Sequence, residues 1–145
     1  MKIKEIFIAS DHAGFEAKEY TKDFILRLGY KVIDLGCNSG KESVDYPDFA
    51  KLLISNLNND DDYGVLICGS GIGISIAANR FNNIRCALCH DTLTAKLSRL
   101  HNNANVLAFG GRILGIGEIN DIVETFFSTD FEGGRHQRRI DKLKV

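Results

Sequence analysis

VLICGSGIGIS, residues Val65–Ser75, joins an apolar run to three glycines within five positions. The apolar half is typical of a buried β-strand, and a helical pattern starts at Ile72, among these glycines. A strand, a tight turn and a helix in this order form the repeating unit of α/β proteins. The stretch therefore predicts that fold class, and it places Cys68 at the end of the strand.

The same alternation extends along the chain on both sides of this stretch. The β-rich runs are Ile3–Ser10, Lys31–Gly36, Gly64–Gly69, Ile84–Cys89 and Asn105–Gly110. Helical patterns occupy Phe15–Leu28, Pro47–Leu57, Ile72–Arg80, Asp91–His101 and Ile116–Phe127, and a basic helical segment follows Gly133-Gly134. Runs this apolar suit strands that are buried on both faces. We predict a single domain, residues 1–145, with a doubly wound, Rossmann-like (flavodoxin-like) five-stranded parallel sheet, helices on both faces and a C-terminal basic helix.

The composition and the net charge of the chain limit the classes of function that it can have. The 145 residues are 44% hydrophobic and 26% charged, as in ordinary globular proteins. The net charge of −1 argues against an overall affinity for nucleic acid or for anionic membranes. No apolar run approaches the roughly 20 residues of a membrane span, and the N-terminus does not fit a signal peptide. We therefore expect a cytoplasmic protein whose four cysteines stay reduced.

Polar residues and glycines stand at three predicted strand ends. They are Ser10-Asp11-His12, Cys68-Gly69-Ser70 and Gly110-Gly111-Arg112. Because ligands of parallel α/β sheets bind beyond the carboxyl ends of the strands, we expect these residues to form one neighbourhood.

The glycine loop has two interpretations. A tight strand-to-helix turn needs one or two glycines, whereas three favour a ligand that approaches the backbone closely. Backbone N–H groups of Gly69–Gly73 can then hold an anion at the start of the helix. The spacing G-x-G-x-G is not the dinucleotide fingerprint, and no acidic residue ends the following strand.

The cysteines also allow alternatives. Cys68 is either a buried filler or a base or nucleophile, because the start of a helix favours a thiolate. Cys86 and Cys89 match C-x-x-C, but in a strand residues three apart point to opposite faces. Core packing is therefore favoured for this pair over a zinc site or a redox couple.

Two further groups stay open from the residues alone. His101 either completes the dipole at a helix end or shuttles protons near neutral pH. Arg135 and Arg139 lie one helical turn apart, so they either belong to a solvated basic helix or grip one phosphate. Asp11 and His12 are either a cap and a surface imidazole or ligand-binding groups.

Taken together, five stretches resemble the type B ribose-5-phosphate isomerases, a family that also includes galactose-6-phosphate isomerase subunits. The resemblance spans essentially the whole chain in collinear order. The stretches are SDHAGFEAK (Ser10–Lys18), DYPDFA (Asp45–Ala50), ICGSGIGISIAANR (Ile67–Arg80), LSRLHNNANVLAFGGR (Leu97–Arg112) and FEGGRHQRRI (Phe131–Ile140).

The resemblance implies an aldose–ketose isomerase of the non-oxidative pentose phosphate pathway, which interconverts ribose 5-phosphate and ribulose 5-phosphate through an enediolate. It implies no metal and no cofactor, and a homodimer whose active sites are shared, with parts of the basic tail serving the neighbouring subunit. Some members of that family lack the loop cysteine and use a glutamate at the position of Ser75, so the resemblance is to the branch that uses the cysteine. Cys68 is then the base, His101 the acid that helps open the sugar ring, and Ser70 a catalytic donor. The implied substrate-binding residues are Asp11, His12, Gly69, Ser70, Gly71, Ile72, Gly73, Asn102, Arg112, Arg135 and Arg139.

Three alternative functions are also open from the sequence. The first is isomerisation of a six-carbon sugar phosphate, such as allose or galactose 6-phosphate. The second is a non-catalytic sugar-phosphate sensor or binding subunit, which the presence of both Cys68 and His101 disfavours. The third is a thiol redox protein that uses Cys86 and Cys89.

Overall fold

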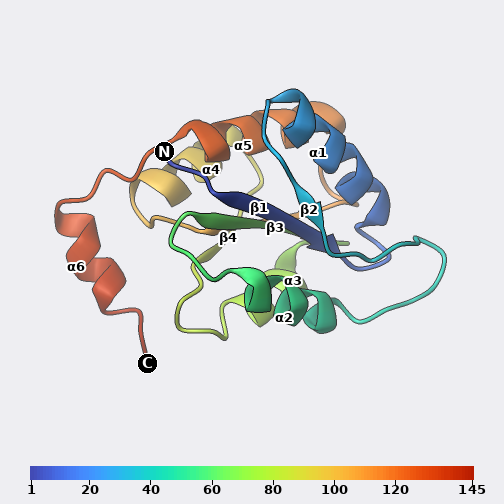
Figure 1. Ribbon diagram of the computed structural model, residues 1–145, viewed down its shortest axis with the longest axis horizontal. Helices are drawn as coiled ribbons and strands as arrows, with labels where there is room; N and C mark the ends of the chain where they lie inside the picture. Colours follow the sequence, from blue (N-terminus) through green and yellow to red (C-terminus); the bar gives the residue numbers. More distant parts are fainter.

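In the computed structural model, which describes residues 1–145, five parallel strands form one sheet in the order β2-β1-β3-β5-β4 (Figure 1). The strands are β1 (Glu5–Ser10), β2 (Ile33–Asp34), β3 (Asp62–Cys68), β4 (Cys86–Leu88) and β5 (Val106–Gly110). The predicted α/β fold with a five-stranded parallel sheet is confirmed. Its strand order differs from the 2-1-3-4-5 of flavodoxin by an exchange of the last two strands.

Helices cover both faces of the sheet, as predicted. One layer holds α1 (Phe15–Arg27), α4 (Thr92–Leu100) and α5 (Ile116–Ser128), and the other holds α2 (Tyr46–Asn56) and α3 (Ile72–Ala78) (Figure 1). The basic helix α6 (Arg135–Asp141) stands apart from both layers. No helix is long and apolar enough to cross a membrane.

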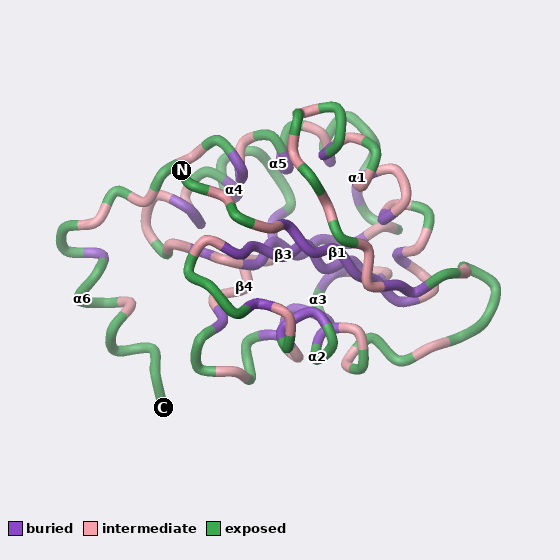
Figure 2. Tube along the Cα trace, viewed as in Figure 1, coloured by how far each residue is buried: buried purple, intermediate pink, exposed green.

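Strand side chains alternate between two cores. In β1, Ile6 and Ile8 join the cluster under α1, α4 and α5, whereas Phe7 and Ala9 join the cluster under α2 and α3. This alternation buries β3 and β5 on both faces, and Figure 2 shows the central strands as the buried layer. The prediction of full burial is wrong for β2 and β4, which remain partly accessible because each is an edge strand.

The turn before β3 is shorter than the sequence indicates. The predicted strand begins at Gly64, after a run of asparagines and aspartates, whereas β3 already begins at Asp62. The Asp62 carboxylate is buried, and its Oδ2 accepts hydrogen bonds from the N–H groups of Asn58 and Asn59, each at 3.0 Å. Asp62 is thus the first residue of β3, and its side chain also closes the turn that precedes the strand.

The C-x-x-C pair is divided between the two cores. Cys86 packs against the cluster under α2 and α3, and Cys89 lies in the opposite cluster, so the predicted placement on opposite faces is confirmed. Burial raises the pKa of Cys89 to about 11 and raises the pKa of Cys86 further. Both thiols therefore stay protonated at neutral pH, which disfavours the redox interpretation.

Candidate active site

A cavity of about 470 Å³ opens where β1 and β3 end. The chain leaves β1 toward β2 on one side and returns to β3 on the other, so this is the point where the winding of the sheet reverses. The predicted neighbourhood of strand ends is found here, and we call it the Cys68 pocket. Its lining consists of Asp11, His12, Ala13, Tyr46, Cys68, Gly69, Ser70, Ile72, Gly73 and Arg112.

The thiol of Cys68 is held by the glycine turn. Cys68 is 4% exposed, and its Sγ accepts a hydrogen bond from the N–H of Gly71 at 3.1 Å. Gly71 has a φ of 79°, and a Cβ atom there would lie 2.6 Å from the backbone carbonyl carbon of Phe109. Only glycine fits this position, and its conformation aims an N–H at the sulfur. This hydrogen bond fixes the position of the Cys68 sulfur where it lines the pocket.

The rest of the turn supplies further donors. Ser70 Oγ accepts a hydrogen bond from the N–H of Ile72 at 3.2 Å, which leaves the Ser70 hydroxyl hydrogen free to donate. Arg112, from the residues that follow β5, is exposed and lies against Gly69. The pocket therefore combines one thiol with a hydroxyl and a guanidinium group.

Tyr46 is a pocket residue that the sequence analysis missed. Its ring lies on Gly73, where a Cβ atom would be 2.6 Å from the ring carbon Cζ. The helical pattern indicates a start at Pro47, and nothing in it shows where the ring before the proline points. The stretch DYPDFA carried the only available signal, as part of the family resemblance.

Asp11 and His12 fix the loops around the pocket. Asp11 is buried, and its Oδ1 accepts a hydrogen bond from the N–H of Gly14 at 3.0 Å. His12 Nδ1 accepts one from the N–H of Val44 at 3.1 Å. A neutral imidazole that accepts at Nδ1 carries its hydrogen on Nε2, so His12 retains one donor for a ligand.

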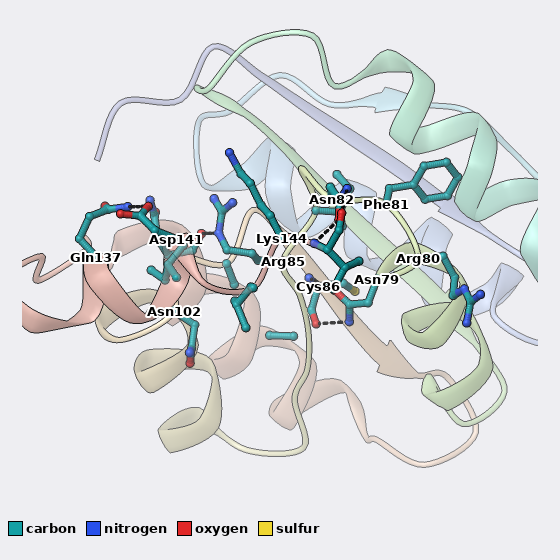
Figure 3. Close-up of a pocket in the computed structure, with 17 residues that line it drawn as sticks. Asn79, Arg80, Phe81, Asn82, Arg85, Cys86, Asn102, Gln137, Asp141 and Lys144 are labelled. Atoms are coloured by element: carbon teal, nitrogen blue, oxygen red, sulfur yellow. Dashed lines mark hydrogen bonds between the residues drawn. The ribbon is translucent and has the colours of Figure 1, made fainter.

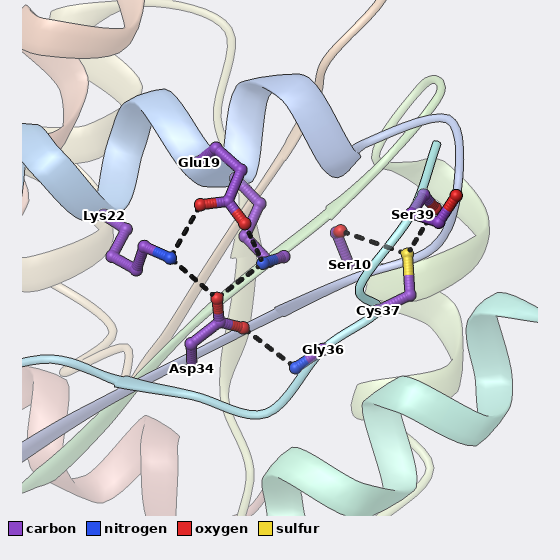
Figure 4. Close-up of polar contacts among 8 residues, drawn as sticks. Ser10, Glu19, Lys22, Asp34, Gly36, Cys37 and Ser39 are labelled. Carbon is purple, nitrogen blue, oxygen red and sulfur yellow. Dashed lines mark hydrogen bonds and ion pairs between the residues drawn. The ribbon is translucent and has the colours of Figure 1, made fainter. Parts of the chain in front are cut away.

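An ion-pair network joins α1 to Asp34 of β2, next to β1 (Figure 4). Lys18 of α1 has a fully buried side chain, and its Nζ lies 2.7 Å from Asp34 Oδ2 and 3.1 Å from Glu19 Oε1. Lys22 Nζ also binds Asp34, at 3.0 Å. Asp34 Oδ1 accepts from the N–H of Gly36 at 2.9 Å, and the Gly36 carbonyl accepts from the N–H of Ser10. The network thus joins α1 to the last residue of β1.

Replacing Asp34 by asparagine is expected to lower the free energy of unfolding by about 2–3 kcal/mol at pH 7, because it leaves the buried Lys18 ammonium poorly compensated. Burial alone raises the pKa of Asp34, but hydrogen bonds from Lys18, from the Gly36 backbone and from Lys22 outweigh it and leave this pKa lowered. The contribution is therefore complete at neutral pH and is lost as the pH falls from about 4 through the lowered pKa. Thermal unfolding at pH 7 and pH 3 measures this difference.

Asp23→Asn is the matched control for this prediction, since Asp23 is an exposed aspartate of α1 without an ion pair. It should leave the melting temperature unchanged at both pH values. An Asp34→Asn variant that is as stable as the wild type at pH 7 would contradict the assigned role of the network.

The remaining sequence-predicted residues lie at the opposite edge of the sheet. Cys68 pairs with Gly110, the last residue of β5, whereas His101 and Asn102 shortly precede Val106, its first residue. The two ends of this five-residue strand are about 13 Å apart. Helix α6, which carries Arg135 and Arg139, also lies beyond the edge at which β1 begins (Figure 1). Within one chain, the structure therefore does not bring these residues to Cys68.

At that edge two imidazoles stack. The rings of His101 and His136 are 4.4 Å apart and 16° from parallel, and Glu132 Oε1 lies 4.0 Å from His136 Nε2. One ligand atom from each residue falls within 4.8 Å of the others, but parallel rings do not direct their nitrogens at one point as zinc sites require. Burial, with the neighbouring His101 and Arg135, lowers the pKa of His136, so this imidazole is neutral at pH 7.

A second cavity of about 620 Å³ separates α6 from the segment between α3 and β4. Figure 3 shows Gln137 and Asp141 of α6 on one side of it and Asn82 and Cys86 on the other. His136 is the only buried residue of α6, and Figure 2 shows the helix exposed along most of its length. The arginines of α6 are therefore exposed on the surface of the chain.

The sequence model of the family described as Ribose/Galactose Isomerase matches residues 6–143. The chain belongs to this family. The match covers both the Cys68 pocket and the edge that carries His101, and it confirms the family resemblance of the five stretches.

Relatives agree over nearly the full length. The chain is 42% identical over 142 residues to ribose-5-phosphate isomerase B of Escherichia coli, which covers 97% of this chain and 95% of that protein. A ribose 5-phosphate isomerase structure from Thermotoga maritima matches with a TM-score of 0.92 and 53% identity, over 97% of each chain.

A third family member was solved with a ligand. The structure of ribose-5-phosphate isomerase B from Mycoplasma genitalium, with bound ribulose 5-phosphate, matches with a TM-score of 0.92 and 45% identity, over 96% of this chain and 93% of that chain. Other members of the family are named more broadly as sugar phosphate isomerases.

Proposed function

We propose that this isomerase-family protein interconverts ribose 5-phosphate and ribulose 5-phosphate without a metal or cofactor. The observation that carries the proposal is the Cys68 thiol, held by the Gly71 N–H in a pocket that also contains a carboxylate, an imidazole, a hydroxyl and a guanidinium group. The names of the Escherichia coli and Thermotoga maritima relatives and the ligand of the Mycoplasma genitalium structure support this substrate.

The proposed reaction is a proton transfer between two neighbouring carbons. Cys68, as thiolate, removes the proton from C2 of the open-chain aldose, and the C1 carbonyl becomes the oxygen anion of an enediolate. The Ser70 hydroxyl and those N–H groups of the Gly69–Gly73 turn that are not bound to Cys68 or Ser70 stabilise that anion. The Cys68 thiol then returns the proton to C1, while the proton on the C2 hydroxyl moves to O1, so that a ketone forms at C2.

Ring opening and phosphate binding require the other edge of the sheet. We propose a two-fold dimer in which His101, Asn102, Arg135 and Arg139 of one subunit complete the Cys68 pocket of its partner. Two features support a second copy at the pocket. Ile72 and Ile76, one turn apart on the outer face of α3, are 50% and 60% exposed, which is typical of a surface that another protein covers. The arginines of α6 project free of their own domain layers.

The first experiment is an assay of purified protein with ribose 5-phosphate in a chelating buffer without added cofactor. Turnover to ribulose 5-phosphate is expected. A folded protein without turnover contradicts the proposal, and parallel assays with allose 6-phosphate and galactose 6-phosphate then decide whether a six-carbon sugar is the substrate. Binding of the phosphates without turnover of any would instead indicate a sensor or binding subunit.

The shared site predicts that two variants, each nearly inactive with ribose 5-phosphate, restore each other's activity. In a heterodimer of Cys68→Ala and His101→Asn chains, one pocket lacks both the thiol and the imidazole, and the other pocket has both. Random pairing gives heterodimers for half of the molecules, so equal co-expression should recover about a quarter of the wild-type activity with ribose 5-phosphate. Each variant expressed alone is the control, and a co-expressed mixture no more active than these controls would contradict a site built from two subunits.

A further inference from the structure

A fully buried arginine, Arg99, precedes the turn of residues 101–104 and lines neither of the two cavities described above. Arg99 lies in the last turn of α4, is 2% exposed and forms no ion pair with a carboxylate. Its guanidinium lies 5.3 Å from the ring centre of Tyr63 and 5.7 Å from that of Phe126. Burial of a cation without a counter-ion costs free energy, so its hydrogen bonds identify what it stabilises.

The hydrogen bonds of Arg99 run to two separate segments. Nη1 donates to Asn103 Oδ1 at 3.0 Å and to the Ala104 carbonyl at 2.6 Å. Nε donates to the Thr129 carbonyl at 3.1 Å. The first two bonds hold the turn of residues 101–104, and the third holds the start of the segment 129–134 that leads into α6. One planar guanidinium therefore fixes both segments relative to each other.

The turn depends on this support. Asn103 has a φ of 45°, a left-handed conformation that few residues other than glycine adopt. Its side chain is bound to Arg99, which sets the direction in which the chain passes from His101 to Ala104. The second segment is tied in next to it, because the N–H of Glu132 donates to the Leu100 carbonyl at 3.1 Å.

We infer that Arg99 is a positioning residue that presents His101 and the arginines of α6 as one preformed unit. The inference rests on the proposed function, in which this unit completes the pocket of the partner. Arg99 acts through its neighbours and touches no substrate. Lysine cannot replace it, because an ammonium group does not reproduce the planar fork that reaches all three acceptors.

The test uses a chemical difference between the two substrates. Ribose 5-phosphate is mainly a closed furanose and needs the ring-opening acid. In ribulose 5-phosphate the oxygen that would close the ring carries the phosphate, so this sugar is already open. A displaced His101 therefore slows turnover of saturating ribose 5-phosphate more than turnover of ribulose 5-phosphate.

We expect Arg99→Lys to lower kcat for ribose 5-phosphate by about 10-fold to 100-fold, since small displacements of reacting groups have effects of this size. The kcat for ribulose 5-phosphate should change by less than about threefold, and KM for both should rise as the α6 arginines lose their position. Ser98→Ala is the matched control, because Ser98 is buried beside Arg99 and its Oγ donates to the Ala95 carbonyl within α4 at 2.8 Å. Ser98→Ala should leave the ratio of the two kcat values unchanged.

Asn103→Gly tests the same link without altering the buried cation. Glycine accepts the positive φ but removes the acceptor of Arg99, so a smaller change of the same ratio is expected, and this variant decides the question if Arg99→Lys does not fold. Equal losses for both substrates, or no loss in folded variants, overturn the inference. An inactive wild type would instead refute the proposed function, and a His101→Asn effect without an Arg99 effect would refute this inference alone.

Discussion

Replacing Cys68 by alanine is expected to lower kcat by about 10³-fold, while the Kd for ribulose 5-phosphate stays within about twofold of the wild-type value. The alanine cannot accept the C2 proton, but it leaves in place the donors and the guanidinium groups that are proposed to bind the sugar phosphate. The measurements are steady-state turnover in both directions and ligand titration by calorimetry. This is the largest effect expected for any single side chain.

Two control variants separate chemistry from packing. Cys68→Ser preserves the shape of the side chain but replaces the thiol by a hydroxyl that is a far weaker acid, so it should be nearly as inactive as alanine. Cys86→Ala removes a thiol of β4 that packs against the same cluster as Cys68. This variant should be as active as the wild type. An active Cys68→Ala variant, or one that fails to fold, would show that the thiol is a packing element.

Replacing His101 by asparagine is expected to lower kcat for ribose 5-phosphate by about 10²-fold, because a positioned acid is needed to open the furanose ring. Turnover of saturating ribulose 5-phosphate should be nearly unchanged, since its chain is already open. The two kcat values are measured from opposite directions with the same preparation. The asymmetry between directions, rather than the size of the loss, identifies ring opening as the role of this imidazole.

His90→Asn is the control for this experiment, since His90 is an exposed histidine that lines neither cavity. It should behave as wild type with both sugars. A His101→Asn variant with the same fractional loss in both directions would assign His101 to the proton transfer or to binding instead.

Local signals explain what the sequence predicted correctly. A strand that ends at Cys68 and a glycine turn that follows it involve neighbours in the chain, so the composition of a short window determines them. The β1 and β3 ends then converge because parallel strands present their carboxyl ends at one edge. The fold class and most of the Cys68 pocket follow from these two facts.

What the sequence did not show depends on contacts between distant segments. The exchange of β4 and β5 in the strand order and the ring of Tyr46 on Gly73 are set by packing across the molecule. The separation of His101 from Cys68 within one chain also depends on how distant segments pack. Arg99 gave no signal at all, since an arginine near a helix end is ordinarily read as a solvent-exposed partner of the helix dipole.

The division of Cys86 and Cys89 between two cores has a consequence for oxidative stress. In extended chain, residues three apart have Cα atoms about 10 Å from each other, beyond the roughly 7 Å that a disulfide tolerates. The two sulfurs also lie on opposite sides of a backbone layer that neither can cross. Oxidants therefore cannot close a bridge within this motif, and the sheet itself insulates one thiol from the other.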